Sequence, residues 1–359
     1  MVQIFQTEPR QVSVQDVREQ LRSLWMSEAL TDRAVIRAHT HNLIVYVPAT
    51  LGDINQAMER VIKATLLRPG RVILIHADST GVDGLNAWVT TYCRPVKNHK
   101  VCGELVALAA SGHLRDEVHS TVSSLLLPDL PVVLVWLDQP SMRDHLFLEL
   151  LEETDRVIFD SSRSEHIVET LRAQSLLPAR FQIGDLTWAR LTPFRRLVAH
   201  LVDEIGAHTL VSRLSSVHIE VVSKAVPSSA VLLAGWLADS LKWEFNKAES
   251  TSSSMTLRYS TSQDAVSVKL NAVESGTVPH GTIMRCVFQG AAGAAFISLT
   301  YVPERACIEL TNMLDGLSER RHGYAAGPVD AASALAEELD FGYDPVYRRA
   351  LQAAVNAFV

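Results

Sequence analysis

Long apolar runs and excess positive charge are both missing from this sequence of 359 residues. The longest wholly apolar stretch, residues 230–238, falls far short of the roughly 20 residues that a helix needs to cross a bilayer. The net charge of −7 and the pI near 6.0 oppose binding to a nucleic-acid backbone, which requires clustered lysine and arginine. We therefore expect a chain that neither spans a membrane nor binds nucleic acid.

Cysteine is scarce as well, with four residues that show none of the close spacings of a zinc site. The first residues are unlike an export signal, because polar and charged side chains interrupt any apolar core. Both observations predict a cytoplasmic chain with free thiols. Cys93 and Cys102 stand on two arms of a predicted hairpin, where cross-strand pairing would bring the sulfurs within bonding range. A redox-regulated disulfide between them is the alternative to two free thiols.

Catalytic motifs are the third absence. The sequence has no G-x-G-x-x-G turn for a dinucleotide, no G-x-S-x-G elbow and no zincin histidine pair. Gly81-Val-Asp-Gly84 lacks the lysine of a phosphate-cradling loop, so an ordinary turn is favoured. His39 and His41 would share a face of a strand and could hold a metal, but no further ligand is implied. We predict no catalytic residue, no cofactor and no metal, and hence a protein that is not an enzyme, although triads can assemble from distant residues.

The residues that are present follow an α/β pattern up to about residue 175. The length and the 47% apolar content favour two domains, each with its own core. Val72 to Ile75 are apolar without alternation, as in a strand of a parallel sheet that is covered on both faces. Residues 87–94 and 101–109 predict a hairpin on the same sheet, which would make it mixed. A first amphipathic helix begins after Ser13 and places Trp25 on its apolar face.

A different pattern follows the break near residues 176–185. A helix starts near Pro193, another is capped by Ser228 or Ser229, and residues 244–311 are successive short strands. Two helices, at about 329–340 and 345–357, close the chain. We predict residues 1–180 as an N-terminal α/β domain with a mixed, mostly parallel sheet, and residues 181–359 as a C-terminal α+β domain with an antiparallel sheet.

A predicted loop at residues 316–328 carries Arg320, Arg321 and His322 between glycines. Guanidinium groups bind phosphates and carboxylates in bidentate fashion, so these residues could contact a phosphate or a partner's carboxylate. A solvated loop is the alternative.

Six strings, spread in order along the chain, carry a resemblance. They are Leu67-Arg-Pro-Gly-Arg-Val72, Val101-Cys-Gly-Glu104, Leu127-Pro-Asp-Leu-Pro-Val-Val-Leu134 with Trp136, Asp155-Arg-Val-Ile-Phe-Asp-Ser161, Asp185-Leu-Thr-Trp-Ala-Arg-Leu-Thr-Pro193 and Leu232-Leu-Ala-Gly-Trp-Leu237. Over roughly residues 35 to 245 their order and spacing resemble those of the OpcA family, the glucose-6-phosphate dehydrogenase assembly proteins of cyanobacteria and actinobacteria. The sequence departs from the family pattern at Val135 and Phe194, where tryptophan is usual.

The resemblance implies a non-catalytic partner that promotes assembly or allosteric activation of glucose-6-phosphate dehydrogenase, in the oxidative pentose phosphate pathway. Such a protein needs surface rather than catalytic residues, because it acts by binding the active form of the enzyme better than the inactive form. We predict Trp188, Arg190 and Arg195 at the contact surface. A structural helix start with Pro193 in its first turn explains the same residues. The competing hypothesis is a sensor or enzyme that binds a sugar phosphate or nucleotide at the N-terminal sheet.

Overall fold

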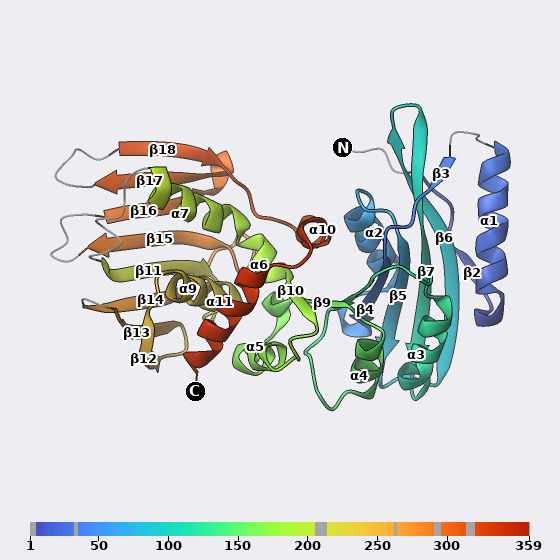
Figure 1. Ribbon diagram of the computed structural model, residues 1–359, viewed down its shortest axis with the longest axis horizontal. Helices are drawn as coiled ribbons and strands as arrows, with labels where there is room; N and C mark the ends of the chain where they lie inside the picture. The colour runs from blue at the N-terminus through green and yellow to red at the C-terminus, as the bar shows by residue number, and fades with distance from the viewer. Residues whose placement is uncertain are drawn as a thin grey trace. The chain divides into compact units, whose positions relative to one another are not determined.

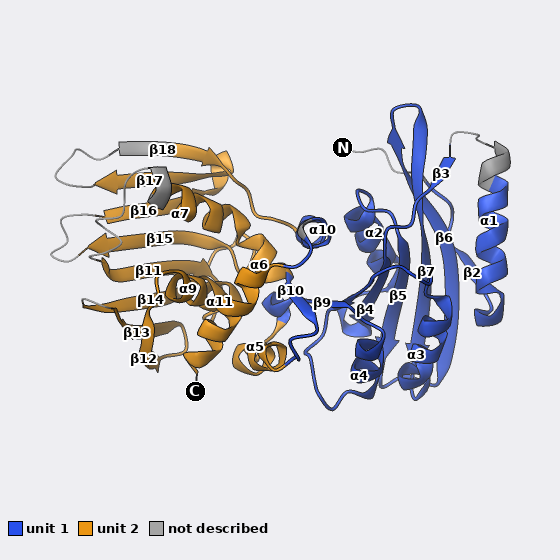
Figure 2. Cartoon of the chain, in the orientation of Figure 1, with its two compact units in different colours: residues 1–163, 177–185, 331–343 blue, residues 164–176, 186–330, 344–359 orange. Residues whose placement is uncertain are grey.

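The computed structural model describes residues 5–31, 35–204, 214–261, 264–290, 296–313 and 320–358 (Figure 1). The chain forms two compact units, and each consists of three separate segments (Figure 2). Unit 1 contains residues 1–163, 177–185 and 331–343, and unit 2 contains residues 164–176, 186–330 and 344–359. A single domain boundary at residue 180 stays a prediction.

Unit 1 is built on a ten-stranded sheet. Its strands follow the path β1-β6-β7-β5-β4-β8-β9-β10, with β2 paired to β6 and β3 paired to β7. The strands are β1 (Phe5–Gln6), β2 (Arg10–Val12), β3 (Val35–Arg37), β4 (Asn42–Pro48), β5 (Arg71–Asp78), β6 (Gly84–Val96), β7 (His99–Ser111), β8 (Val132–Trp136), β9 (Arg156–Phe159) and β10 (Gln182–Asp185). The pairs from β7 through to β10 are parallel, whereas β6 is antiparallel to β7. The predicted mixed, mostly parallel sheet is confirmed.

The parallel strands of unit 1 have a recognisable order. Leaving out the hairpin strand β6, the path β7-β5-β4-β8-β9-β10 is 3-2-1-4-5-6 in chain order, the order of the doubly wound dinucleotide-binding fold. The helices of this unit are α1 (Val17–Thr31), α2 (Ile54–Thr65), α3 (Leu114–Leu125), α4 (His145–Glu152) and α10 (Ala331–Phe341). Residues 72–75 of β5 and all of β8 are buried, which explains why their sequences are apolar without alternation.

Unit 2 is built on an eight-stranded sheet in the order β12-β13-β14-β11-β15-β16-β17-β18. Only the pair of β11 with β14 is parallel among these strands, so the predicted antiparallel character is confirmed. The strands are β11 (Leu214–Val222), β12 (Glu244–Ser250), β13 (Ser254–Ser260), β14 (Ala265–Val273), β15 (Ile283–Gly290), β16 (Phe296–Val302), β17 (Cys307–Met313) and β18 (Arg320–Ala325). The helices are α5 (Ile167–Ser175), α6 (Leu186–Arg190), α7 (Thr192–Glu204), α9 (Ser228–Ser240) and α11 (Pro345–Asn356). Figure 1 shows α7, α9 and α11 in front of one face of this sheet.

Two local predictions in unit 2 are wrong. Residues 320–325 form strand β18, which pairs with β17, and not a loop. The polar residues at the start of β18 do not predict a strand by themselves. Pairing with β17 supplies the hydrogen bonds that make this segment a strand. Helix α9 begins at Ser228 with Pro227 as its N-cap, so neither Ser228 nor Ser229 caps it.

Candidate functional site

The carboxyl edge of the parallel sheet in unit 1 is the first place to look for a ligand site. The chain passes from β4 to β5 on one side of β4, and the later strands β8, β9 and β10 lie on the other side. Such a switch point leaves a crevice outside the strand ends, and doubly wound proteins bind their ligands there. In dinucleotide-binding members, the phosphates sit against the N-terminus of the helix that follows the first strand.

That helix here is α2, and a carboxylate of the chain occupies its N-terminus. The Oδ1 atom of Asp53 accepts hydrogen bonds from the backbone N–H groups of Asn55, at 2.9 Å, and Gln56, at 3.0 Å. These donors belong to the first turn of the helix, which is the part that a phosphate would use. A phosphate at this position would therefore have to displace Asp53 or approach its negative charge.

Charged side chains of the chain itself pair with one another beside the end of β4. Arg115, on α3, donates to both carboxylate oxygens of Asp144, at 2.9 and 2.5 Å, and to the hydroxyl of Tyr46, at 3.1 Å. It also pairs with Asp116 at 2.6 Å. Burial acts to lower the pKa of Arg115, but the hydrogen bonds to Asp144 and Tyr46 outweigh it and raise the pKa overall. The guanidinium is therefore charged, and its charge is already matched by carboxylates.

These contacts decide what the edge can do chemically. A nucleotide or sugar phosphate needs free donors and positive charge, and here both are bound internally by Asp53 and Asp144. The ring of Tyr46 also stacks on Trp136 with centroids 3.8 Å apart. The contacts among Arg115, Asp144 and Tyr46 join α3 and the start of α4 to β4. Paired side chains thus lie at the edge where doubly wound proteins bind anionic ligands.

A second polar cluster, the Glu104 cluster, surrounds a fully buried carboxylate on β7. Glu104 is 0% exposed and accepts from Trp25 Nε1 at 2.6 Å, from Arg71 Nε at 2.5 Å and from Arg37 Nη2 at 3.0 Å. His39 Nε2 lies 3.4 Å from Oε1 of Glu104, the oxygen that Arg71 also binds. Burial acts to raise the pKa of Glu104, but the hydrogen bond from His39 and the charge of Arg71 outweigh it and hold the pKa at about 2. The cluster thus anchors α1 and β3 to the sheet.

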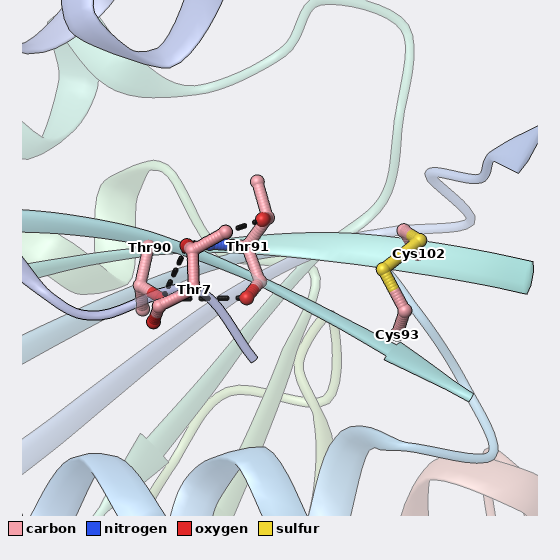
Figure 3. The surroundings of a disulfide bond; sticks show 5 residues. All are labelled: Thr7, Thr90, Thr91, Cys93 and Cys102. Atoms are coloured by element: carbon pink, nitrogen blue, oxygen red, sulfur yellow. Dashed lines mark hydrogen bonds between the residues drawn. A yellow bond between two sulfur atoms is a disulfide. The ribbon is translucent and has the colours of Figure 1, made fainter. Parts of the chain in front are cut away.

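The disulfide lies beside the Glu104 cluster. Cys93 on β6 and Cys102 on β7 are directly opposite in the hairpin and are bonded, and Trp25 packs against both. Figure 3 shows the disulfide and, set apart from it, Thr7, just after β1, whose hydroxyl lies 3.1 Å from that of Thr90. The expectation of free thiols is therefore wrong for Cys93 and Cys102, and the alternative, a disulfide between them, is present. Its redox role stays a prediction.

Two members of the Glu104 cluster carry a local signal in the sequence. Arg71 and Glu104 lie within two of the strings that carry the family resemblance, and each is a charged residue directly before an apolar run of its strand. Gly103, between Cys102 and Glu104, is also constrained, since a Cβ there would lie 2.6 Å from the ring of Tyr92. Buried charge in an apolar strand implies a partner, but the sequence does not say which strand supplies it.

The predicted contact residues around Pro193 have mixed outcomes. Trp188 is only 1% exposed and donates to Asp344 at 2.7 Å, so the prediction that it is an exposed anchor is wrong. The guanidinium of Arg195 stacks over the Trp188 ring at 3.6 Å from its centroid. Asp344 also caps α11, so this group joins α6 and α7 to α11. Arg190 and Arg195 are partly exposed, and their place in a partner interface stays a prediction.

Other predicted residues are not brought together into a site. The side chains of Arg320, Arg321 and His322 lie outside the described residues, although their backbone belongs to β18. His39 pairs with Glu104, whereas His41 lies beside the hydroxyl of Thr40, at 2.8 Å. The two histidines therefore have separate partners. Among the described residues, no helix is both long and apolar enough to cross a membrane.

Solved structures of dehydrogenases align with most of the chain at low similarity. A dehydrogenase (MviM) from Clostridium difficile is 10% identical, with a TM-score of 0.45 over 87% of this chain and 96% of that chain. Apo scyllo-inositol dehydrogenase from Lactobacillus casei is 11% identical, with a TM-score of 0.47 over 90% of this chain and 95% of that chain. These scores are too low to support any conclusion about activity.

Curated proteins give closer matches. A protein of Synechococcus elongatus that is named OpcA and associated by that name with the OxPP cycle is 31% identical over 181 residues, which are 49% of this chain and 40% of the relative. Its counterpart in Nostoc punctiforme is 28% identical over 200 residues, which are 54% of this chain and 43% of that relative. The matched region is thus less than half the length of these relatives.

Two family models match the chain in succession. The model described as the glucose-6-phosphate dehydrogenase subunit N-terminal domain, OpcA_G6PD_assem, matches residues 62–175. The model described as the corresponding C-terminal domain, OpcA_G6PD_C, matches residues 181–351. Together the two ranges cover well over half of the chain, and the chain belongs to the OpcA family.

Proposed function

We propose that this chain is a non-catalytic assembly factor or allosteric activator of glucose-6-phosphate dehydrogenase, which it binds in the cytoplasm as part of the oxidative pentose phosphate pathway. Membership of the OpcA family supports the identity of the partner, because the family models are described as subunit domains of that dehydrogenase. The relatives associated by name with the OxPP cycle support the pathway.

The internal pairing at the carboxyl edge of unit 1 is the observation that carries the non-catalytic part of the proposal. Asp53 caps the N-terminus of α2, and Arg115 pairs with Asp144 beside the hydroxyl of Tyr46. A substrate or nucleotide site at this edge would require breaking a half-buried, bidentate ion pair and a helix cap. The competing hypothesis of a sugar-phosphate or nucleotide site on this sheet is correspondingly disfavoured.

Activation then has to come from differential binding. A protein that binds the active oligomer of the enzyme more tightly than the inactive form raises the active fraction by that difference in affinity and by no more. A tenfold preference corresponds to about 1.4 kcal/mol, which a few interface contacts can supply. We propose Arg190 and Arg195 as part of the contact surface, Arg320, Arg321 and His322 as contacts to a phosphate or carboxylate, and the Cys93–Cys102 pair as a redox control.

The test combines the purified chain with purified glucose-6-phosphate dehydrogenase from the same organism. Complex mass is measured by light scattering after size-exclusion chromatography, and the initial rate is measured at glucose 6-phosphate concentrations below KM. We expect a complex and a higher rate. Arg190→Ala should weaken both, whereas the matched control Arg60→Ala, on exposed helix surface in unit 1, should weaken neither.

The chain alone is assayed in parallel. Calorimetric titration with NADP and with glucose 6-phosphate should give no binding heat, and no sugar phosphate should be turned over. Turnover by the chain alone would overturn the proposal in favour of an enzyme. An unchanged rate and mass in the mixture would overturn it in favour of another partner.

A further inference from the structure

The hairpin of β6 and β7 extends beyond the other strands of the sheet in unit 1. Strand β5 pairs with β7 from Glu104 inward, and β1 pairs with β6 at Tyr92 and Cys93. The turn at residues 97–98 lies about 10 Å further out than Cys93, at roughly 3.4 Å per residue. Figure 1 shows this turn standing clear of the other strands of unit 1. We call residues 94–101 the hairpin tip.

The hairpin tip is strongly basic. It contains Arg94, Lys97, His99 and Lys100, and no aspartate or glutamate occurs anywhere in residues 84–103. Lys97 and His99 are exposed, whereas Arg94 and Lys100 are half-buried. Since the whole chain has a net charge of −7, the tip is a local reversal of the sign of the surface charge.

The Glu104 cluster adds positive charge at the base of the tip. Arg37 and Arg71 both pair with Glu104, so two guanidinium groups meet one carboxylate. Arg37 belongs to β3, which pairs with β7 at residues 100–102, and its side chain is 43% exposed. The cluster therefore extends the positive field of the tip instead of cancelling it.

The disulfide holds the tip in one shape. Cys93 and Cys102 are directly opposite and bonded, so residues 94–101 form a covalently closed loop. Trp25 of α1 packs against both cysteines and fixes the base of this loop. A loop that is rigid before binding loses less conformational freedom when it binds, which favours its use as a contact element.

Protection of a strand edge is the alternative explanation of the same residues. Proline and lysine keep an exposed edge from pairing with a foreign strand, and Pro95 lies on the β6 side of the tip. In that case the charges of the tip oppose aggregation and have no effect on the binding of a partner. Both explanations disfavour recognition by an added strand, so any recognition by the tip has to come from its side-chain charges.

The sign of these charges decides which partner surface the tip fits. A surface rich in carboxylates is repelled by the net charge of the chain but attracted at the tip, which therefore orients the encounter. Ammonium and guanidinium groups also form charge-assisted hydrogen bonds with carboxylates. We propose that the hairpin tip docks on an acidic patch of glucose-6-phosphate dehydrogenase. This docking rests on the proposed function, which names the dehydrogenase as the partner.

The test measures the affinity of the purified dehydrogenase for the full chain by calorimetry, at about 50 and about 300 mM NaCl. The tip variant is K97E with K100E. The matched control is K224E with K269E, which makes the same change of net charge at two exposed lysines of unit 2. Far-UV circular dichroism and titration of free thiols check that each variant is folded and that its disulfide is closed.

We expect the tip variant to bind at least about tenfold more weakly at low salt, because two attractions become repulsions, whereas the control should bind like the parent. The milder variant K97Q with K100Q, which removes the charges without reversing them, should have an intermediate affinity. High salt should weaken binding by the parent more than binding by the tip variant, since screening acts on the charges that the variant no longer supplies.

The outcomes separate this docking from the proposed function. If the parent binds the dehydrogenase and the folded tip variant binds equally well, docking by the tip is overturned and the proposed function stands. If the parent does not bind the dehydrogenase, both are overturned. Equal weakening in the control would assign the effect to net charge and overturn a specific role of the tip. Duplex DNA that binds the parent but not the tip variant would also overturn it, by assigning the tip to nucleic acid.

Discussion

The Glu104 cluster makes the sharpest prediction about stability. Glu104→Gln keeps the size of the side chain but removes the negative charge that faces Arg71 and Arg37. Glu104 is fully buried, and removal of one partner from a buried ion pair costs about 3–5 kcal/mol, because the remaining charge is left unpaired. We expect the variant to lose about 3 kcal/mol of the free energy of unfolding at pH 7.

The lowered pKa of Glu104 corresponds to a similar magnitude. Its ordinary pKa is 4.5, and the folded value is about 2. At about 1.4 kcal/mol per pKa unit, this difference corresponds to about 3 kcal/mol of stability at neutral pH. Since the folded pKa is depressed, the contribution is fully present above pH 4.5 and is lost as the pH falls through about 2.

The stability loss and its pH dependence are both measured by urea unfolding followed by circular dichroism. The series runs from pH 7 down to the lowest pH at which the chain stays folded. The stability difference between the parent and Glu104→Gln should be largest at neutral pH and should shrink below pH 4.5. Glu59→Gln, on the exposed face of α2, is the control and should change stability by less than about 0.5 kcal/mol. A loss below about 1 kcal/mol for Glu104→Gln, or a pH-independent difference, would refute the account of the cluster.

Three other predictions concern the same unit. The double variant Cys93→Ser, Cys102→Ser should lower the free energy of unfolding by about 2–3 kcal/mol, the value for a disulfide that closes a loop of this length. Urea titration measures the loss, and the reduced parent protein should match the variant. Asp53→Ala should lower the thermal midpoint, because it removes a helix cap worth about 1 kcal/mol. It should leave activation of the dehydrogenase intact. A gain of nucleotide affinity without loss of stability would contradict the assignment of Asp53 as a structural cap. Gly103→Ala should destabilise by about 1–3 kcal/mol, because its Cβ would meet the Tyr92 ring at 2.6 Å, and a parent-like unfolding curve would disprove that contact.

The sheet of unit 1 could be predicted from the sequence because its signals are local. Residues 72–75 of β5 are an apolar run without alternation, which is typical of a strand that is covered on both faces. The β6–β7 hairpin was predicted from two β-rich runs with charged residues between them, and its pairing then placed Cys93 opposite Cys102. Each of these inferences needs only neighbouring residues and the geometry of one element.

The polar clusters could not be predicted, because they depend on which elements become neighbours. Glu104 meets side chains from α1, from β3 with the loop after it, and from β5, and no spacing in the sequence records that convergence. The same limit explains Trp188, since an aromatic residue beside a proline turn has the same local sequence whether it is buried or exposed. Strand β18 was missed because its partner strand, and not its own sequence, determines that it pairs.

The central claim is that the chain acts by docking to glucose-6-phosphate dehydrogenase and performs no chemistry itself. The most direct measurement is a titration of that enzyme with the chain, in which complex formation and the initial rate at low substrate are recorded on the same samples. The account predicts that both rise with the same midpoint, and that the chain alone turns over no substrate. A rate that rises without a complex, a complex that leaves the rate unchanged, or turnover by the isolated chain would contradict it.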